Sequence, residues 1–310
     1  MNTLFKRVLA VAIGILTLGI SAAYSQSIKD IERASLSAFS GIKLGGDFVL
    51  DLRYGTQYQA KVSTEELLAE YIQFDVSGGV LTVSMDERKV PAEVKRLFRG
   101  KNNAATFKLI VTMPQALRTL SLEDKAVLAT VSELVVSPEG LDITLKENAR
   151  IASFNITADR VNVKMERKAE ATLEVTADSL AVDMSGSASL ELTQHVSKVG
   201  YTLAYNANLV SGGETETMAL NAKGTSKAIL NGRAPVVSYK VTNASNVNAV
   251  NLSTEEAQVE MSGLCTLTEA ATQDIYINIG AGANLIFRNE PVIHILSVKN
   301  ASITPYDKRK

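Results

Sequence analysis

The fold is decided by two related stretches, TADRVNVKM at Thr157–Met165 and TADSLAVDM at Thr176–Met184, which begin nineteen residues apart. Five of their nine letters are identical, and the apolar letters fall in the same places. Apolar and polar residues alternate at the end of each stretch, as in Leu180, Val182 and Met184. A period of two is typical of a strand with one face turned inward. The pair therefore indicates a repeated β unit.

The unit recurs over most of the chain. Alignment on Met184 gives anchor positions that are 23, 20, 19, 19, 19, 19, 20, 18 and 19 residues apart: Leu122, Leu145, Met165, Met184, Leu203, Ala222, Val241, Met261, Ile279 and Val298. The residue four positions after each anchor is small: Ala126, Ala149, Ala169, Ala188, Ala207, Ser226, Ser245, Cys265, Ala283 and Ser302. A bend that commonly carries Gly or Asn lies between the two positions. Cys265, the only cysteine, therefore takes an inward slot as a small apolar residue, not as a nucleophile.

A unit of this length cannot bury its apolar face alone, so neighbouring units must stack. The sequence predicts an all-β fold, a right-handed parallel β-helix with about 19 residues per coil, over residues 116–304. Each coil is expected to hold a short strand, a bend, a second strand and a third stretch that returns the chain. A β-sandwich of many short strands is the competing fold, and the constant period argues against it.

Residues 1–25 have the pattern of a signal peptide. Lys6 and Arg7 precede an uncharged run from Val8 to Ile20, and SAAYSQS follows as a small-residue cleavage site. An uncleaved anchor is the alternative, but spanning a bilayer needs about 20 apolar residues. We expect an exported protein, periplasmic, on the outer surface or extracellular, without a transmembrane segment once the signal is removed.

Residues 26–115 show strand patterns without the repeat, and we expect an all-β segment that caps the first coil; residues 305–310 form a C-terminal tail. A basic stretch, DERKVPAEVKRLFRGKNN from Asp86 to Asn103, interrupts the strands with apolar residues at helical spacing. It is either an amphipathic element that docks on an anionic surface, or a short solvated helix that packs its apolar side onto the sheet.

The stretches FSGIKLGGDFVLDL, GGVLTVSM, KLIVTMPQALRTLSLEDKAVL and the MSGSASLEL-type coils resemble the family described as "Putative auto-transporter adhesin, head GIN domain". The resemblance covers almost the whole chain after the signal peptide. It implies a β-helix-like protein outside the cytoplasm of a Gram-negative bacterium, with no established function. No membrane β-barrel pattern follows the repeats up to Lys310, so self-translocation is not expected of this sequence.

Few classes of chemistry fit the sequence. The formal net charge of −1 gives no reason to expect nucleic acid as a partner. No zinc-protease, P-loop, dinucleotide-binding or nucleophile-elbow motif is present. His195 and His294 are five coils apart and cannot share a metal; His294, four residues before an anchor, is predicted to point inward and pack.

One acidic column is a candidate site. Glu139, Asp159 and Asp178 stand six positions before successive anchors, so stacking would place them roughly 5 Å apart from coil to coil. Such a column could hold Ca²⁺ or tune one carboxyl group for acid–base work. The alternative is that these residues form the corners through their own backbone hydrogen bonds. Apart from this Ca²⁺, no cofactor is predicted.

Outward polar and aromatic residues are the other candidates for surface contacts. Tyr201 and Tyr239 are predicted to point inward, and the outward candidates are Tyr205, Asn206, Asn208, Asn246, Asn248 and Tyr276. The sequence predicts a secreted, non-enzymatic, adhesion-type protein whose solenoid surface binds a glycan or an envelope protein. The alternatives are a polysaccharide lyase or hydrolase that uses the acidic column, and a periplasmic scaffold or sensory module.

Overall fold

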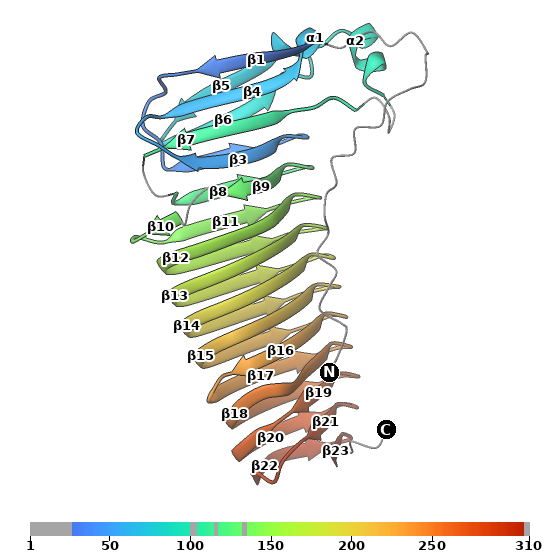
Figure 1. Ribbon diagram of the computed structural model, residues 1–310. Coiled ribbons are helices and arrows are strands. Elements are labelled where there is room, and N and C mark those ends of the chain that lie inside the picture. The colour runs from blue at the N-terminus through green and yellow to red at the C-terminus, as the bar shows by residue number, and fades with distance from the viewer. Residues whose placement is uncertain (1–26, 100–103, 115–116, 132–134, 307–310) are drawn as a thin grey trace, which may run out of the picture.

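The computed structural model describes residues 27–99, 104–114, 117–131 and 135–306, which form a tall stack of strands (Figure 1). The predicted signal peptide lies outside these residues. Within them, no helix is both long and apolar enough to cross a membrane.

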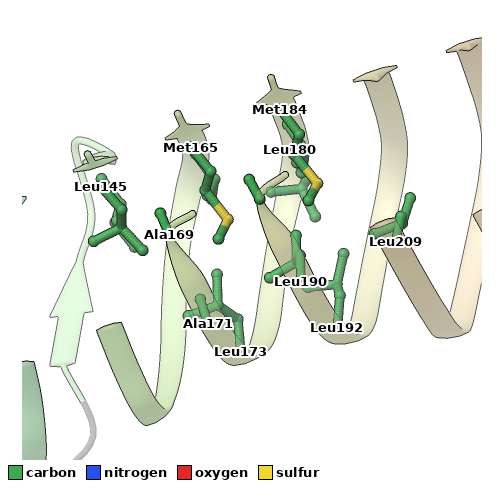
Figure 2. Packing of buried hydrophobic residues seen from close by; sticks show 14 of the residues in the cluster. Leu145, Met165, Ala169, Ala171, Leu173, Leu180, Met184, Leu190, Leu192 and Leu209 are labelled. Carbon is green, nitrogen blue, oxygen red and sulfur yellow. The ribbon is translucent and has the colours of Figure 1, made fainter. Parts of the chain in front are cut away.

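The central coils are long strands that pair in parallel with the next coil. In β13 and β14, Glu170 pairs with Ser189 and Met184 pairs with Leu203, so the repeat of 19 residues is one turn of the stack. The predicted parallel β-solenoid is confirmed. The expected third stretch is not separate, because one strand continues through a corner and makes both sides of its coil (Figure 2). These long strands are β12 (Arg150–Met165), β13 (Glu170–Met184), β14 (Ser189–Leu203), β15 (Asn208–Ala222) and β18 (Asn246–Ser262).

The coils have two sides. Face A consists of the residues that follow each turn; besides the first halves of the long strands it contains β1 (Ile28–Arg33), β4 (Gln59–Glu65), β7 (Lys108–Met113), β3 (Val49–Tyr54), β9 (Val127–Val131), β16 (Lys227–Arg233), β19 (Thr266–Glu269), β21 (Asn284–Phe287) and β23 (Ser302–Pro305). Face B consists of the residues that lead into each turn; besides the second halves it contains β5 (Ile72–Ser77), β6 (Val80–Met85), β2 (Gly41–Leu44), β8 (Thr119–Leu122), β11 (Leu141–Leu145), β17 (Val236–Thr242), β20 (Ala271–Gly280) and β22 (Val292–Lys299). The short strand β10 (Val135–Ser137) pairs with the middle of β12.

The stack begins within the N-terminal segment. Strand β2 pairs in parallel with β8, with Leu44 beside the anchor Leu122, and β3 pairs in parallel with β9. Beyond them, antiparallel pairs β1–β4, β4–β7 and β5–β6 form the N-terminal end. Two short helices complete this end: α1 (Glu66–Ala69), and α2 (Ala92–Leu97) in the basic stretch, where Val94 and Phe98 pack against the core.

Each turn uses a left-handed residue two positions after the anchor. The φ angle is positive at Asp124, Glu147, Arg167, Gly186, Tyr205, Gly224, Asn243, Gly263, Ala281 and Asn300. Left-handed backbone is unfavourable for residues with a Cβ atom. Gly186 has a second reason to be glycine, because a Cβ atom there would lie 2.7 Å from the Cα of Arg167 in the coil before.

The core consists of rows of equivalent residues. Met165, Met184 and Leu203 are paired neighbours in one row and are fully buried. Figure 2 shows Met165 and Met184 of this row. Cys265 is buried in the row of small residues, as predicted. Ser302 is an exception: the last turn is one residue shorter, so Ser302 pairs with Asn284 at an outward position and is exposed.

Candidate functional site

A shallow groove runs along the outer surface of face B. Its floor follows one register row, in which Ala181, Gly200, Ala219 and Ser238 are adjacent on successive coils. These small residues lie between larger ones in the same row, Asn162 on one side and Gln258 on the other. The groove over this part of the row has a volume of about 610 Å³. A second section, of about 650 Å³, shares Ser238 and Lys240 with the first and continues toward Tyr276 and Leu296.

The next outward row on face B forms a polar rim. Its members are hydroxyl, amide and charged side chains: Thr144, Lys164, Asp183, Thr202, Asn221, Lys240, Glu260 and Asn278. Lys240 Nζ lies 2.9 Å from Glu260 Oε1, and Lys164 Nζ lies 2.9 Å from Glu166 Oε1. Both signs of charge therefore alternate along the rim, and its hydrogen-bonding groups suit a long polar ligand better than a strongly charged one.

An aromatic stack lies at the end of the groove. The rings of Tyr276 and His294 lie with centroids 4.5 Å apart and planes 10° from parallel. His294 Nε2 lies 2.7 Å from Asp274 Oδ1, which fixes the orientation of the imidazole. The predicted inward direction of His294 is wrong. A bulge after Ile295 shifts the register of β22, so His294 pairs with Tyr276 at an outward position.

Two members of the predicted acidic column, Asp159 and Asp178, occupy equivalent places on neighbouring coils. Asp159 and Asp178 lie between the pairs Ala158–Ala177 and Arg160–Ser179, and all three predicted carboxylates are exposed. Glu139 is one coil earlier and forms an ion pair with Arg118 at 2.7 Å. Within the described ranges, no group of three His, Cys, Asp or Glu residues could hold a metal ion. None of the three lines either section of the groove.

The other predicted contacts lie on different surfaces. Tyr205 is 68% exposed at a turn, next to Asn206, whose Oδ1 accepts a hydrogen bond from the Thr225 hydroxyl. Asn208 and Asn246 share a row on face A, with Lys227 between them, and Asn248 is exposed on the same strand as Asn246. Tyr276 is half-buried on face B. These predicted contacts therefore do not form one patch, and of Tyr205, Asn206, Asn208, Asn246 and Tyr276 only Tyr276 lies in the groove.

The interior contains two polar layers that the sequence did not reveal as such. Tyr201 and Tyr239 are buried, as predicted, in the same row and two coils apart. The Tyr201 hydroxyl is hydrogen-bonded to Gln194 and Ser211, and burial raises its pKa well above the usual value.

The second polar layer contains Tyr239, Thr254 and the fully buried Glu269. Their side-chain oxygens are close, but none has a hydrogen-bond partner with good geometry among the described residues. Burial raises the pKa of Glu269 to about 7, and the hydroxyl groups of Tyr239 and Thr254 counteract part of that effect. The only sequence signal for this layer is a charged residue eight positions after an anchor, where Leu173 and Leu192 stand in other coils.

Known proteins resemble this chain in sequence pattern and in fold. The model of the family described as "Putative auto-transporter adhesin, head GIN domain" matches residues 38–210 and 197–291. None of the curated proteins matches. A solved structure of a putative adhesin from Parabacteroides distasonis is 13% identical, with 91% of this chain and 98% of that chain covered and a TM-score of 0.50.

Two further solved structures align with the same 91% and 98% coverage. A putative adhesin from Parabacteroides merdae is 14% identical with a TM-score of 0.47, and a putative lipid binding protein from P. distasonis is 15% identical with a TM-score of 0.43. At these identities the comparison with solved structures concerns the fold alone.

Proposed function

Since the chain belongs to the family described as "Putative auto-transporter adhesin, head GIN domain", we propose that it is an exported, adhesion-type protein that binds an extended glycan along the groove of face B. The observation that carries the proposal is the axial groove itself. Small side chains form its floor over four successive coils, while the rows around it carry longer side chains.

The chemistry of the groove fits a carbohydrate chain. Sugars present hydroxyl groups for hydrogen bonds and apolar C–H faces for stacking on aromatic rings. The rim offers amide and hydroxyl groups at Thr202, Asn221 and Asn278, and Tyr276 supplies an aromatic ring at one end. A stack of equivalent coils repeats these groups every ~4.8 Å, so contacts can add up along an extended ligand.

The test uses two glycines that lie on opposite faces of neighbouring coils. A Cβ atom at Gly200, in the groove floor, would have no atom within 4 Å, and the same holds for Gly212 on face A. Arginine at either position can therefore be accommodated without disturbing the core. Binding to a glycan array is measured for the wild type, Gly200→Arg and Gly212→Arg.

We expect Gly200→Arg to weaken glycan binding at least tenfold, and Gly212→Arg to bind like the wild type. Equal binding by the wild type and Gly200→Arg would refute the groove as the site. A reducing-end assay on the same glycans, with Asp159→Ala and Asp178→Ala as variants, separates binding from cleavage. Turnover that depends on either aspartate would replace the proposal with the enzymatic alternative.

A further inference from the structure

The last coil that the structure describes leaves part of the core uncovered. Strand β22 pairs with β20, and β23 pairs with β21; within the described residues neither has a neighbour on its other side (Figure 1). Ile293, Ile295 and Val298 are in register with Ile275, Ile277 and Ile279, which are interior residues. The earlier three are at most 2% exposed, whereas the last three are 38%, 62% and 39% exposed. Interior positions are therefore exposed to solvent at this end, where no further described coil covers them.

Two further apolar side chains of β22 are exposed at this end, besides the three of the interior row. Val292 is 60% exposed, and Leu296, at the bulge, is 71% exposed. Together these side chains form one apolar edge on β22. An open strand edge with apolar side chains favours pairing with another strand.

The opposite end has different properties. Its face A edge is β1, which is antiparallel to β4 and carries Lys29, Asp30, Glu32 and Arg33. Charged edge strands disfavour pairing with a further strand. On face A, a head-to-tail stack would place β23 against this charged edge, and it would also generate open filaments. On face A, the two ends of the molecule are therefore poor partners for each other.

We propose that the C-terminal edge is the interface of a twofold homodimer, in which β22 packs antiparallel to β22 of a second copy and β23 packs beside β23. A twofold axis perpendicular to both faces maps each face onto itself. Interior residues of one copy then meet interior residues of the other on both sides at once. A second copy has the same two faces at the same spacing, so both sheets continue across the interface. A twofold dimer is also a closed assembly, which cannot grow into a filament.

Charge complementarity supports the same arrangement. Glu290 lies just before β22, and Lys299 is its last residue; both are exposed. Antiparallel packing of two copies brings Glu290 of each copy toward Lys299 of the other, at both ends of the interface. The bulge at Leu296 interrupts the backbone ladder, so apolar packing is expected to contribute most of the binding free energy.

Dimerisation would also extend the groove. Face B of both copies would lie on one side of the assembly, with the Tyr276 and Leu296 ends of the two grooves meeting at the interface. This consequence rests on the proposed function, whereas the dimer itself does not.

The test is sedimentation velocity of the purified protein over a range of concentrations. We expect the wild type to sediment as a dimer, and Leu296→Lys and Ile295→Lys to associate at least tenfold more weakly. The matched control is Leu264→Lys, which places the same charge at a leucine that is 80% exposed on a turn away from the edge; it should remain dimeric.

A charge swap tests the orientation with surface substitutions alone. Glu290→Lys should weaken the dimer, and addition of Lys299→Glu to that variant should restore it. A wild type that stays monomeric at all concentrations would overturn the proposal. A dimer that neither Leu296→Lys nor Glu290→Lys weakens would overturn it as well, because it would form through another surface.

Discussion

The hydroxyl group of Tyr201 lies 2.7 Å from the Oγ of Ser211 across the interior of the solenoid, and it also donates a hydrogen bond to the Oε1 of Gln194. All three side chains are at most 2% exposed. Tyr201→Phe would leave two buried polar groups without this partner, which costs about 1–3 kcal/mol. We expect a lower midpoint of thermal unfolding, measured by circular dichroism.

The control for Tyr201 removes the polar partners together. In the variant Tyr201→Phe, Gln194→Leu, Ser211→Ala, no polar group of the network is left unsatisfied, so the midpoint should recover part of the loss. An unchanged midpoint for Tyr201→Phe alone would show that water or another group takes over the hydroxyl's bonds.

A pH dependence of stability should come from Glu269. Burial raises its pKa from 4.5 to about 7 in the folded protein. Its stabilising contribution is therefore fully present below pH 4.5, and it is lost as the pH rises through about 7, because the folded state must then hold a buried charge. The free energy of unfolding that is lost over this pH range is roughly 3 kcal/mol.

Glu269→Gln tests this dependence, since glutamine does not ionise. We expect the variant to unfold at a higher temperature than the wild type at about pH 8 and to lose most of that advantage at about pH 4. Glu260→Gln, at an exposed position of face B, is the matched control and should leave the pH profile of stability unchanged. If Glu269→Gln lost stability with rising pH as much as the wild type does, another group would be responsible for the pH dependence.

The sequence predicts the architecture well, because stacking makes each coil impose the same constraints on the next. The rows of Met165, Met184 and Leu203, and the slot of Cys265, follow from spacing alone. The predicted direction of His294 is wrong because it is counted back from the anchor Val298 across the bulge at Leu296, and one extra residue reverses the side assigned to every residue beyond it. The groove could not be predicted, because its floor of Ala181, Gly200 and Ala219 depends on the size of neighbouring rows and not on any motif.

Substitutions at the left-handed turn positions of two neighbouring coils should change the unfolding midpoint in opposite directions. Tyr205 and Gly224 occupy equivalent left-handed positions, with φ of 61° and 81°. Tyr205→Gly should raise the unfolding midpoint, because a left-handed non-glycine residue costs about 1 kcal/mol and this side chain is mostly exposed. Gly224→Ala should lower it, because its Cβ atom would lie 2.8 Å from the backbone nitrogen of Tyr205. The same sign for both variants would contradict this account of the turn.

The aromatic ring of Tyr276 should matter for ligand binding more than for the fold. Tyr276→Ala removes the ring on which a sugar could stack, and for comparison a pair of aromatic side chains contributes about 0.5–1.5 kcal/mol beyond the area that it buries. We expect several-fold weaker glycan binding in isothermal titration, together with a modest fall in the unfolding midpoint because the variant also loses the stack on His294. Tyr276→Phe keeps the ring and its stack on His294, so it should bind nearly as the wild type does. If Tyr276→Phe loses as much affinity as Tyr276→Ala, the hydroxyl group and not the ring makes the contact.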